Sequence, residues 1–206
     1  MKILYTESKL RNLKVSLSNG EIKKLPKKLF LAYSIQYKAL AYDIKELLEK
    51  NNIIITKIKQ VLGCSKIRLS DDESILFIGS GRFHSMNLFL QAKNIFILDN
   101  NRIINIQESE INALRSKRKT ALLKFLSAEN IGIFVSTKPG QSNLKKALLL
   151  KHRLNKKEKS CYIFVSNKID ISQFENFNID SWINTACIGL SYDNPDIINL
   201  DEIPDI

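Results

Sequence analysis

The feature that most constrains the fold of this chain is a regular alternation of short apolar segments with amphipathic ones. Residues 53–58 and 74–78 are rich in Ile and short enough to be buried strands. Residues 36–50 instead place apolar side chains three to four positions apart, which is the spacing of a helix. Because strands buried on both faces occur in parallel sheets covered by helices, this rhythm predicts β-α-β connections.

The rhythm occurs twice along the chain, over about 90 residues each time. The expected strands are residues 28–34, 53–58, 74–78 and 94–99 in the first unit, and residues 131–137, 160–166 and 180–186 in the second. The expected helices are residues 36–50, 84–93, 144–154 and 172–177. We therefore predict an α/β protein of two related β-α-β-α-β units, each with a four-stranded type of parallel sheet flanked by helices.

A long amphipathic segment, residues 108–129, is the expected connecting helix. Its candidate buried stripe consists of Ile111, Leu114, Leu122, Phe125 and Leu126. The basic run at residues 116–119 is interpreted as a solvated face rather than a recognition patch. After the next strand, residues 139–141 (Pro-Gly-Gln) predict a turn, and Ser142 is a candidate cap for the following helix.

The chain carries 32 basic and 21 acidic side chains, a net charge of +11. It also contains 29 Ile, 25 Lys and 19 Asn but only 7 Arg, so we interpret the charge first as a compositional bias. Two alternatives stay open: docking to an acidic or RNA-associated partner and, less favoured, direct binding of nucleic acid. Lys is a weaker sign of nucleic-acid recognition than Arg because it lacks a planar guanidinium.

The hydropathy of the chain predicts no membrane segment, because its apolar runs are far shorter than the ~18 residues of a spanning helix. The first residues reach an acidic side chain at Glu7 without an apolar core or cleavage site, so they do not resemble a signal peptide. We expect a cytoplasmic protein.

The three cysteines, Cys64, Cys161 and Cys187, are widely spaced and odd in number, which argues against a disulfide framework. Cys64 and Cys187 each follow an expected strand, and the carboxyl ends of strands are where sites gather in open α/β sheets. Cys161 lies inside an expected strand, where a small buried side chain is the simplest interpretation.

Five short segments stand out by their order along the chain. They are residues 25–37 (from Leu-Pro to Gln-Tyr), 60–64 (Gln-Val-Leu-Gly-Cys), 77–84 (Phe-Ile-Gly-Ser-Gly-Arg-Phe-His), 139–141 (Pro-Gly-Gln) and 183–187 (Ile-Asn-Thr-Ala-Cys). Each alone is a weak signal, but together they resemble the second and third domains of the diphthamide synthase family. The resemblance runs from about Leu25 to the C-terminus.

The resemblance implies a domain organisation and an activity. Residues 1–24 correspond to a remnant of the family's first domain (its last strand, at residues 3–6, and a linker), residues 25–107 to the second domain, and residues 108–206 to the connecting helix and third domain. The family is a non-classical radical S-adenosylmethionine enzyme with a [4Fe-4S] cluster. It transfers a 3-amino-3-carboxypropyl group to a histidine of translation elongation factor 2, the first step of diphthamide synthesis.

The resemblance also implies site residues. Cys64 and Cys187 match two of the family's three cluster ligands, and thiolates are soft ligands suited to iron–sulfur clusters. The implied cofactor-binding residues are Gly79, Gly81, Arg82, Phe83, His84 and Gln141. Gly79 and Gly81 would allow close backbone approach to the cluster or cosubstrate, and Arg82 could pair with the cosubstrate carboxylate. For Arg82 and His84, a structural turn packed on the next helix stays open as the alternative.

Two departures from the family pattern matter. The family's first domain, with its cysteine, is missing, so we favour a separate chain that supplies the third ligand. The family's third cysteine is usually followed by Pro-Arg, whereas Cys187 is followed by Ile188 and Gly189. We expect Cys64 and Cys187 to point into one shared pocket. The alternatives are a non-catalytic or electron-relay partner of a full-length diphthamide synthase, and a basic α/β module that binds RNA or ribosomal protein.

Overall fold

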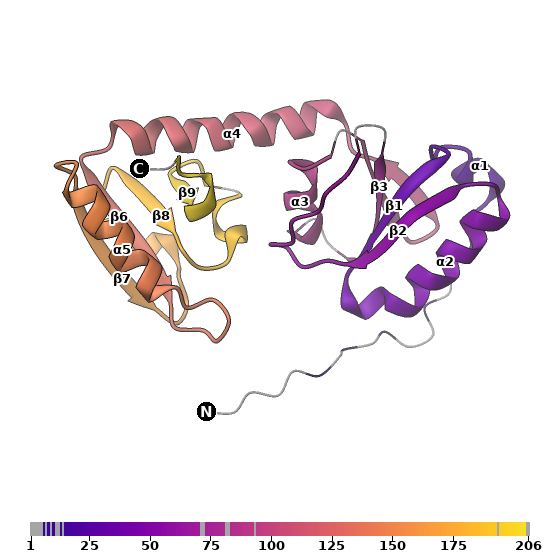
Figure 1. The fold of residues 1–206 in the computed structure, drawn as a ribbon, viewed down its shortest axis with the longest axis horizontal. Coiled ribbons are helices and arrows are strands. Elements are labelled where there is room, and N and C mark those ends of the chain that lie inside the picture. Colours follow the sequence, from indigo (N-terminus) through magenta and orange to yellow (C-terminus); the bar gives the residue numbers. More distant parts are fainter. Residues whose placement is uncertain are drawn as a thin grey trace. The chain divides into compact units, whose positions relative to one another are not determined.

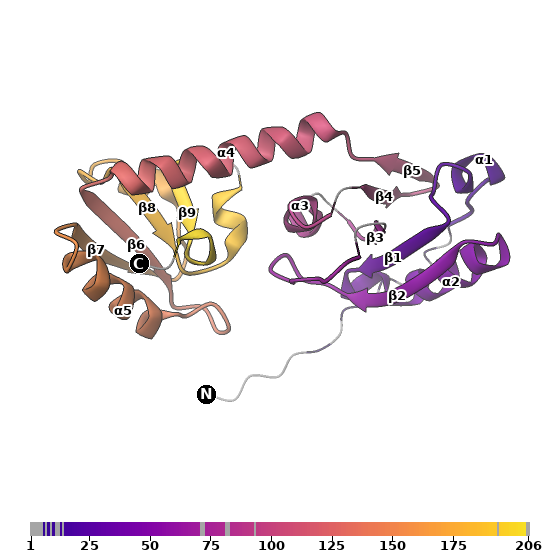
Figure 2. The ribbon, with the colours of Figure 1, turned by 45° about the horizontal axis from the view of Figure 1, so that its top comes forward.

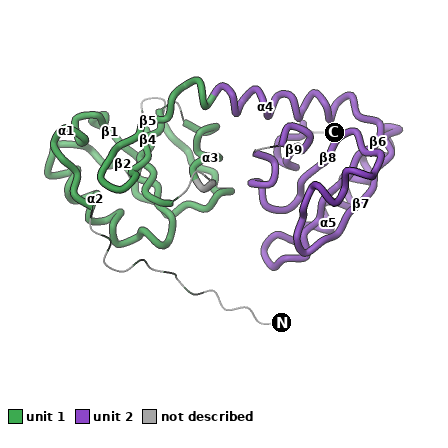
Figure 3. The backbone as a smooth tube through the Cα atoms, turned by 180° about the vertical axis from the view of Figure 1, so that it is seen from behind, with its two compact units in different colours: residues 1–111 green, residues 112–206 purple. Residues whose placement is uncertain are grey.

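The computed structural model describes residues 6, 8, 10, 13, 15–70, 73–80, 83–92, 94–192 and 194–204, apart from the side chains of Phe83 and His84 (Figure 1). The chain divides into two compact units, Met1–Ile111 and Asn112–Ile206 (Figure 3). The strand expected at residues 3–6 falls almost wholly outside the described residues.

Unit 1 is built on a five-stranded sheet with the order β2-β1-β3-β4-β5. Its strands are β1 (Lys28–Tyr33), β2 (Ile54–Gln60), β3 (Ser74–Ile78), β4 (Ile95–Asp99) and β5 (Arg102–Asn105). The first four are parallel, and β5 returns antiparallel to β4. Every residue of the central strand β3 is buried, as the continuous apolar sequence predicts for a parallel sheet.

Three helices accompany this sheet: α1 (Asn19–Ile22), α2 (Lys38–Lys50, preceded by the 3-10 turn η1, Ile35–Tyr37) and α3 (Phe83–Phe89). Helix α2 buries Leu40, Ala41, Ile44 and Leu48, which share one hydrophobic cluster with Leu29 and Leu31 of β1. The amphipathic spacing seen in the sequence therefore does cover a sheet face.

Two elements of unit 1, α1 and β5, are not predicted by the sequence pattern. Strand β5 has only four residues and follows a tight turn in which Asn100 adopts a φ of 53°. Its exposed edge is protected by α1, because the Glu21 carboxylate accepts a hydrogen bond of 2.6 Å from the Ile103 N–H. Both elements are too short for hydrophobic periodicity to reveal them.

Unit 2 has a four-stranded parallel sheet with the order β7-β6-β8-β9. Its strands are β6 (Asn130–Ser136), β7 (Ser160–Ser166), β8 (Ser181–Asn184) and β9 (Ile197–Asn199). The other elements are the C-terminal part of α4 (Glu108–Ser127), α5 (Leu144–Asn155), η2 (Ile171–Phe174), η3 (Ile188–Ser191) and η4 (Leu200–Glu202). The order matches β2-β1-β3-β4 of unit 1, which confirms two related α/β units.

Unit 2 packs two different clusters around its sheet. Helix α5 lies against β6 and β7 (Figure 2), and its Ala147 and Leu150 join Phe125 of α4 in one buried cluster. A second cluster is aromatic and is centred on Phe134 and Trp182, whose rings stack at 4.3 Å. The alternating side chains of β6 supply both clusters.

Several local expectations for unit 2 are wrong. Arg118 is not solvated but buried (8% exposed), because it bonds to groups more than 70 residues away along the chain. Leu126 is 53% exposed rather than part of the buried stripe. The N-cap position of α5 is Asn143, whose side chain makes no cap hydrogen bond, and not Ser142. Residues 171–174 form a 3-10 turn in place of the short α-helix expected at 172–177, and β9 was not expected.

Candidate functional site

The carboxyl ends of the parallel strands gather the candidate residues within each unit. In unit 1 the loop carrying Cys64 follows β2, and the segment that begins with Gly79 follows β3. In unit 2 the turn containing Gln141 follows β6, and Cys187 follows β8. Because parallel strands end at the same edge of a sheet, each unit presents one cysteine loop and one motif segment at one edge.

The Cys64 loop leaves β2 through Val61, which is 1% exposed and donates its N–H to the Tyr33 carbonyl at 2.8 Å. A tight turn follows. The Leu62 N–H donates to the Ser65 hydroxyl at 2.8 Å, and the Ser65 N–H donates back to the Leu62 carbonyl at 2.9 Å. Cys64 lies at the outside of this turn and is exposed.

Side chains from α3 and the turn after it hold the Cys64 loop. The Ser65 carbonyl accepts hydrogen bonds from the Asn87 amide (2.9 Å) and the Gln91 amide (3.0 Å). The Ile67 N–H donates to the Gln91 side-chain oxygen at 2.9 Å. Since α3 is the helix that the 77–84 motif leads into, the segments that directly follow the two family motifs of unit 1 are joined by hydrogen bonds.

Gly79 is required by packing in its own unit. A Cβ added there would lie 2.5 Å from the buried Phe77 ring and 3.0 Å from the Ser34 hydroxyl. Gly79 also lines a cavity of about 420 Å³, together with Ser80, Tyr37 and Asp99 among others. The remaining residues of this motif are only partly described: Gly81 and Arg82 lie outside the described residues, and so do the side chains of Phe83 and His84.

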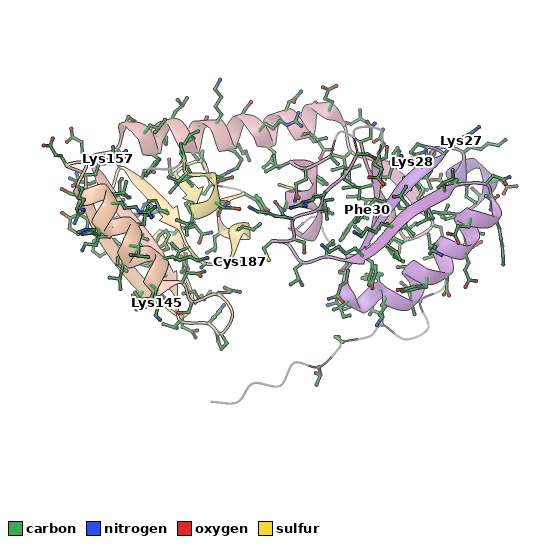
Figure 4. The ribbon with its side chains drawn as sticks, viewed as in Figure 1. Lys27, Lys28, Phe30, Lys145, Lys157 and Cys187 are labelled. Carbon is green, nitrogen blue, oxygen red and sulfur yellow. The ribbon has the colours of Figure 1, made fainter. Side chains whose placement is uncertain are left out.

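Cys187, labelled in Figure 4, is half-buried, and hydrogen bonds within its loop hold the backbone around it. The Asn184 side chain donates to the Cys187 carbonyl at 2.7 Å and accepts from the Ala186 N–H at 2.9 Å. The Thr185 hydroxyl donates to the Phe134 carbonyl at 2.7 Å, which fixes the start of the loop to the end of β6. The backbone on both sides of Cys187 is thus held in place.

Gln141 closes the turn that the Pro-Gly-Gln sequence predicts. Its N–H donates to the Lys138 carbonyl at 3.1 Å, and Gly140 has the positive φ (77°) that the third position of such a turn requires. The next residue but one, Asn143, donates its side-chain amide to the Thr185 carbonyl at 2.7 Å. This bond draws the Asn143 side chain away from a capping role and ties the Gln141 turn to the Cys187 loop.

Cys161 differs from the other two cysteines. It lies inside β7 in the hydrophobic core and is 5% exposed, as the sequence suggested. Burial raises the pKa of its thiol, so the thiolate form that binds metals is disfavoured.

Whether the residues present fit an iron–sulfur cluster depends on the donors around Cys64 and Cys187. Both thiols stand in loops outside the core, unlike Cys161. Among the residues that the structure describes, the buried Tyr192 hydroxyl of unit 2 has no hydrogen-bond partner, and its pKa is raised by burial and then by the nearby Glu202 carboxylate. Cys187 and Tyr192 flank the two ends of η3, and an unpaired donor on this turn would suit an anionic group held by that cysteine. In the described part of the chain, no three or more His, Cys, Asp or Glu side chains form a metal-binding group.

A buried polar network beneath the Cys187 loop escaped the sequence analysis. Arg118 pairs with both carboxylate oxygens of Glu202 and donates to the carbonyls of Ser191 and Ile197, each at 2.7 Å. Asn199 accepts from Asn184 at 2.9 Å and donates to the Ser191 hydroxyl at 2.7 Å. Only Asn184 lies in a recognised motif. The other partners come together through tertiary folding and carry no local signal.

Comparisons with known proteins agree with the fold. The family model of putative diphthamide synthesis proteins matches residues 1–197. The 2-(3-amino-3-carboxypropyl)histidine synthase of Pyrococcus horikoshii is 28% identical over 188 residues, which make up 85% of this chain and 54% of that protein. Subunit 1 of the synthase of Yarrowia lipolytica is 27% identical over 174 residues, 78% of this chain and 40% of the subunit.

Solved structures point the same way. Crystal structures of Dph2 from Pyrococcus horikoshii, one of them with a 4Fe-4S cluster, match with a TM-score of 0.74 and 26% identity. The match covers 89% of this chain and 58% of theirs. The chain thus spans about half the length of the curated relatives it matches. None of the helices in the described ranges is long and apolar enough to cross a membrane. Since the family model covers nearly the whole sequence, this chain belongs to the diphthamide synthesis family.

Proposed function

We propose that this chain is part of a non-classical radical S-adenosylmethionine enzyme with a [4Fe-4S] cluster. The enzyme transfers a 3-amino-3-carboxypropyl group to a histidine of translation elongation factor 2 in the cytoplasm. The observation that carries this proposal is the contrast among the cysteines: the two in family motifs stand in loops at strand ends, whereas Cys161 is buried in the core. The names of the relatives and the 4Fe-4S cluster in the Dph2 structure support it.

In this proposal Cys64 and Cys187 each supply one thiolate to the cluster. When bound, such a cluster supplies the electron that cleaves S-adenosylmethionine into methylthioadenosine and a 3-amino-3-carboxypropyl radical. The residues of this chain bind and orient. Gly79 lines a cavity within the usual size range of small-molecule sites, and Gln141 lies on the turn bonded to the Cys187 loop. Gly81, Arg82, Phe83 and His84 complete the proposed cosubstrate site.

The third cluster ligand would come from a separate chain that carries the family's first domain. Exposed apolar side chains on unit 2 support a docking surface for such a partner; they are Leu148, Leu149, Tyr162, Val165 and Phe177. Strand β7 is at the edge of its sheet, so its outer backbone groups are also open to a partner.

The basic side chains of α5 and of the turn after it support a second contact, with the translation factor. Lys145 lies near the start of α5, and Lys157 lies just beyond its end (Figure 4). Exposed lysines of this kind favour encounter with an acidic protein surface.

Anaerobic reconstitution with iron and sulfide, alone and with candidate first-domain partners, tests the proposal. We expect a [4Fe-4S] absorption band that Cys64→Ala and Cys187→Ala each abolish, while the matched Cys161→Ala keeps it. Loss of the band in Cys161→Ala but not in Cys187→Ala would refute the ligand assignment. Release of methylthioadenosine on addition of S-adenosylmethionine then reports turnover.

One observation favours a second candidate, a non-catalytic or electron-relay partner of a full-length synthase. Ile188 and Gly189, which begin η3, stand where the family has Pro-Arg, so a cation beside the cysteine is lost. The charge of Arg118 is paired with Glu202 and does not substitute for that cation. A cluster that forms without any release of methylthioadenosine would favour this second function.

A further inference from the structure

The side-chain amide of one residue forms hydrogen bonds with two backbone groups of the Cys64 loop. Gln91 lies two residues after the end of α3. Its nitrogen donates to the Ser65 carbonyl at 3.0 Å, and its oxygen accepts from the Ile67 N–H at 2.9 Å. Because a backbone N–H can only donate and a carbonyl can only accept, these two partners fix the orientation of the amide.

A second amide does the same in unit 2. Asn184, the last residue of β8, is buried, donates to the Cys187 carbonyl at 2.7 Å and accepts from the Ala186 N–H at 2.9 Å. Both amides thus bond one N–H and one carbonyl of a loop that has just left its sheet. A carboxamide offers the same donor and acceptor as a peptide group, so each replaces the strand partner that the loop has lost.

We propose that Gln91 and Asn184 are positioning residues, each of which fixes the backbone beside one cysteine so that its sulfur is held ready to bind the proposed cluster. We call each amide together with its two hydrogen bonds to the loop backbone a clamp. The role toward the metal rests on the proposed function, whereas the existence of the two clamps rests on the hydrogen bonds alone. Metal ligands tolerate displacements of only about 0.5 Å, and loops reach that precision when supporting residues lock them. Neither amide needs to touch the metal.

Each clamp is itself anchored. The Gln91 nitrogen also donates to the Asn87 carbonyl at 3.0 Å, which ties it to α3. The Asn184 nitrogen also donates to the Asn199 side chain at 2.9 Å. Asn199 in turn donates its N–H to Glu202, the partner of Arg118. An amide side chain that was free to rotate would lose rotamer entropy on forming its bonds to the loop. The additional bonds of Gln91 and Asn184 already restrict their side chains, so that this entropy cost is smaller.

The test uses the full chain, reduced and metal-free, in four variants. Gln91→Met and Asn184→Leu remove both hydrogen bonds of a clamp at similar volume. Gln91→Glu and Asn184→Asp keep the acceptor and lose the donor. The matched controls are the exposed Gln107→Met and Asn167→Leu, which lie outside both loops. Hydrogen exchange of the loop amides and alkylation of each cysteine by iodoacetamide are followed by mass spectrometry.

We expect each apolar variant to speed exchange of its own loop by about tenfold and to change alkylation of its own cysteine severalfold, with the other loop unchanged. The exchange rates and alkylation of the acidic variants should lie between those of wild type and those of the apolar variants. The acidic variants therefore still test the inference if an apolar variant fails to fold. Equal exchange and alkylation in wild type and all four variants, within twofold, would overturn the inference.

Anaerobic reconstitution then separates the clamps from the proposed function. If the wild-type chain forms a cluster with a first-domain partner, we expect the variants to alter its electron paramagnetic resonance line shape. Gln91→Met should do so with a melting temperature close to that of the controls, whereas Asn184→Leu also leaves the buried Asn199 side chain without its donor and lowers the melting temperature. An unaltered line shape would refute the link to the metal. If no cluster forms in wild type while the exchange effects appear, the proposed function fails and the clamps stand.

Discussion

The two cysteine loops are built differently, although their units share one strand order. Cys64 follows β2, whose counterpart in unit 2 is β7, while Cys187 follows β8, whose counterpart in unit 1 is β3. The Cys64 loop is exposed and held by side chains from α3, whereas the Cys187 loop is half-buried above a polar network that ends on α4. Similar scaffolds thus place a thiol at the same sheet edge from different connections. The internal repeat alone would not align these two cysteines.

The largest effect should come from the network under the Cys187 loop. Arg118→Met removes four hydrogen bonds and leaves the Glu202 carboxylate without its counter-ion. Because Arg118 is buried and Glu202 is partly buried, removal of the guanidinium leaves a carboxylate and two carbonyls without their partner, and we expect a loss of about 3 kcal/mol in the free energy of unfolding of unit 2. Urea denaturation followed by the fluorescence of Trp182 measures it.

The effect of Arg118→Met should be confined to the Cys187 loop. Hydrogen exchange should rise in the Cys187 loop and remain unchanged in the Cys64 loop. The control is Arg115→Met on the same helix, whose exposed side chain makes a long contact of 3.4 Å with Asn112. If Arg118→Met is no more destabilising than this control, the network does not support the loop.

The next effect lies at the matching edge of unit 1. Gly79→Ala forces a methyl group against the Phe77 ring, which has no room to move in the core. We expect about 1–3 kcal/mol of destabilisation from overpacking, measured by thermal or urea unfolding. Gly20→Ala is the control, since its nearest neighbour would be 3.7 Å away. Equal stability of the two variants would mean that Gly79 is free for a purely ligand-facing role.

Thiol reactivity compares the three cysteines directly. We expect iodoacetamide to alkylate Cys64 fastest, the half-buried Cys187 more slowly and Cys161 slowest. Since burial raises the pKa of Cys161, its thiolate fraction is small at neutral pH and grows as the pH rises. Mass spectrometry of tryptic peptides at pH 7 and pH 9 gives the order. Rapid labelling of Cys161 at pH 7 in the folded protein would contradict its placement in the core.

The repeating strands and helices could be predicted from the sequence, because elements that bury a sheet have apolar residues at regular spacing. Strand β7 begins and ends as expected at residues 160–166, and the turn at Gly140 follows from its neighbours. Arg118 was misjudged because its partners are carbonyls and a carboxylate that lie more than 70 residues away along the chain. The clamps could not be foreseen either, since a loop's backbone geometry has no local pattern. That Cys64 and Cys187 share one pocket stays a prediction.

The smallest effect is a pH dependence confined to the Cys64 loop. Hydrogen bonds from the Thr56 hydroxyl and then the Ser70 N–H lower the pKa of Glu73, at the end of that loop. A lowered folded-state pKa stabilises the loop above the unfolded-state value of about 4.3, and this contribution is lost as the pH falls through the folded-state pKa. Glu73→Gln should therefore cost a few tenths of a kcal/mol at pH 7, and this cost should shrink as the pH falls through the folded-state pKa of Glu73. Hydrogen exchange of residues 61–70, corrected for intrinsic rates, measures the difference, with Glu175→Gln in unit 2 as control. An equal response of the Cys187 loop would show that acid acts on the whole chain rather than on this carboxylate.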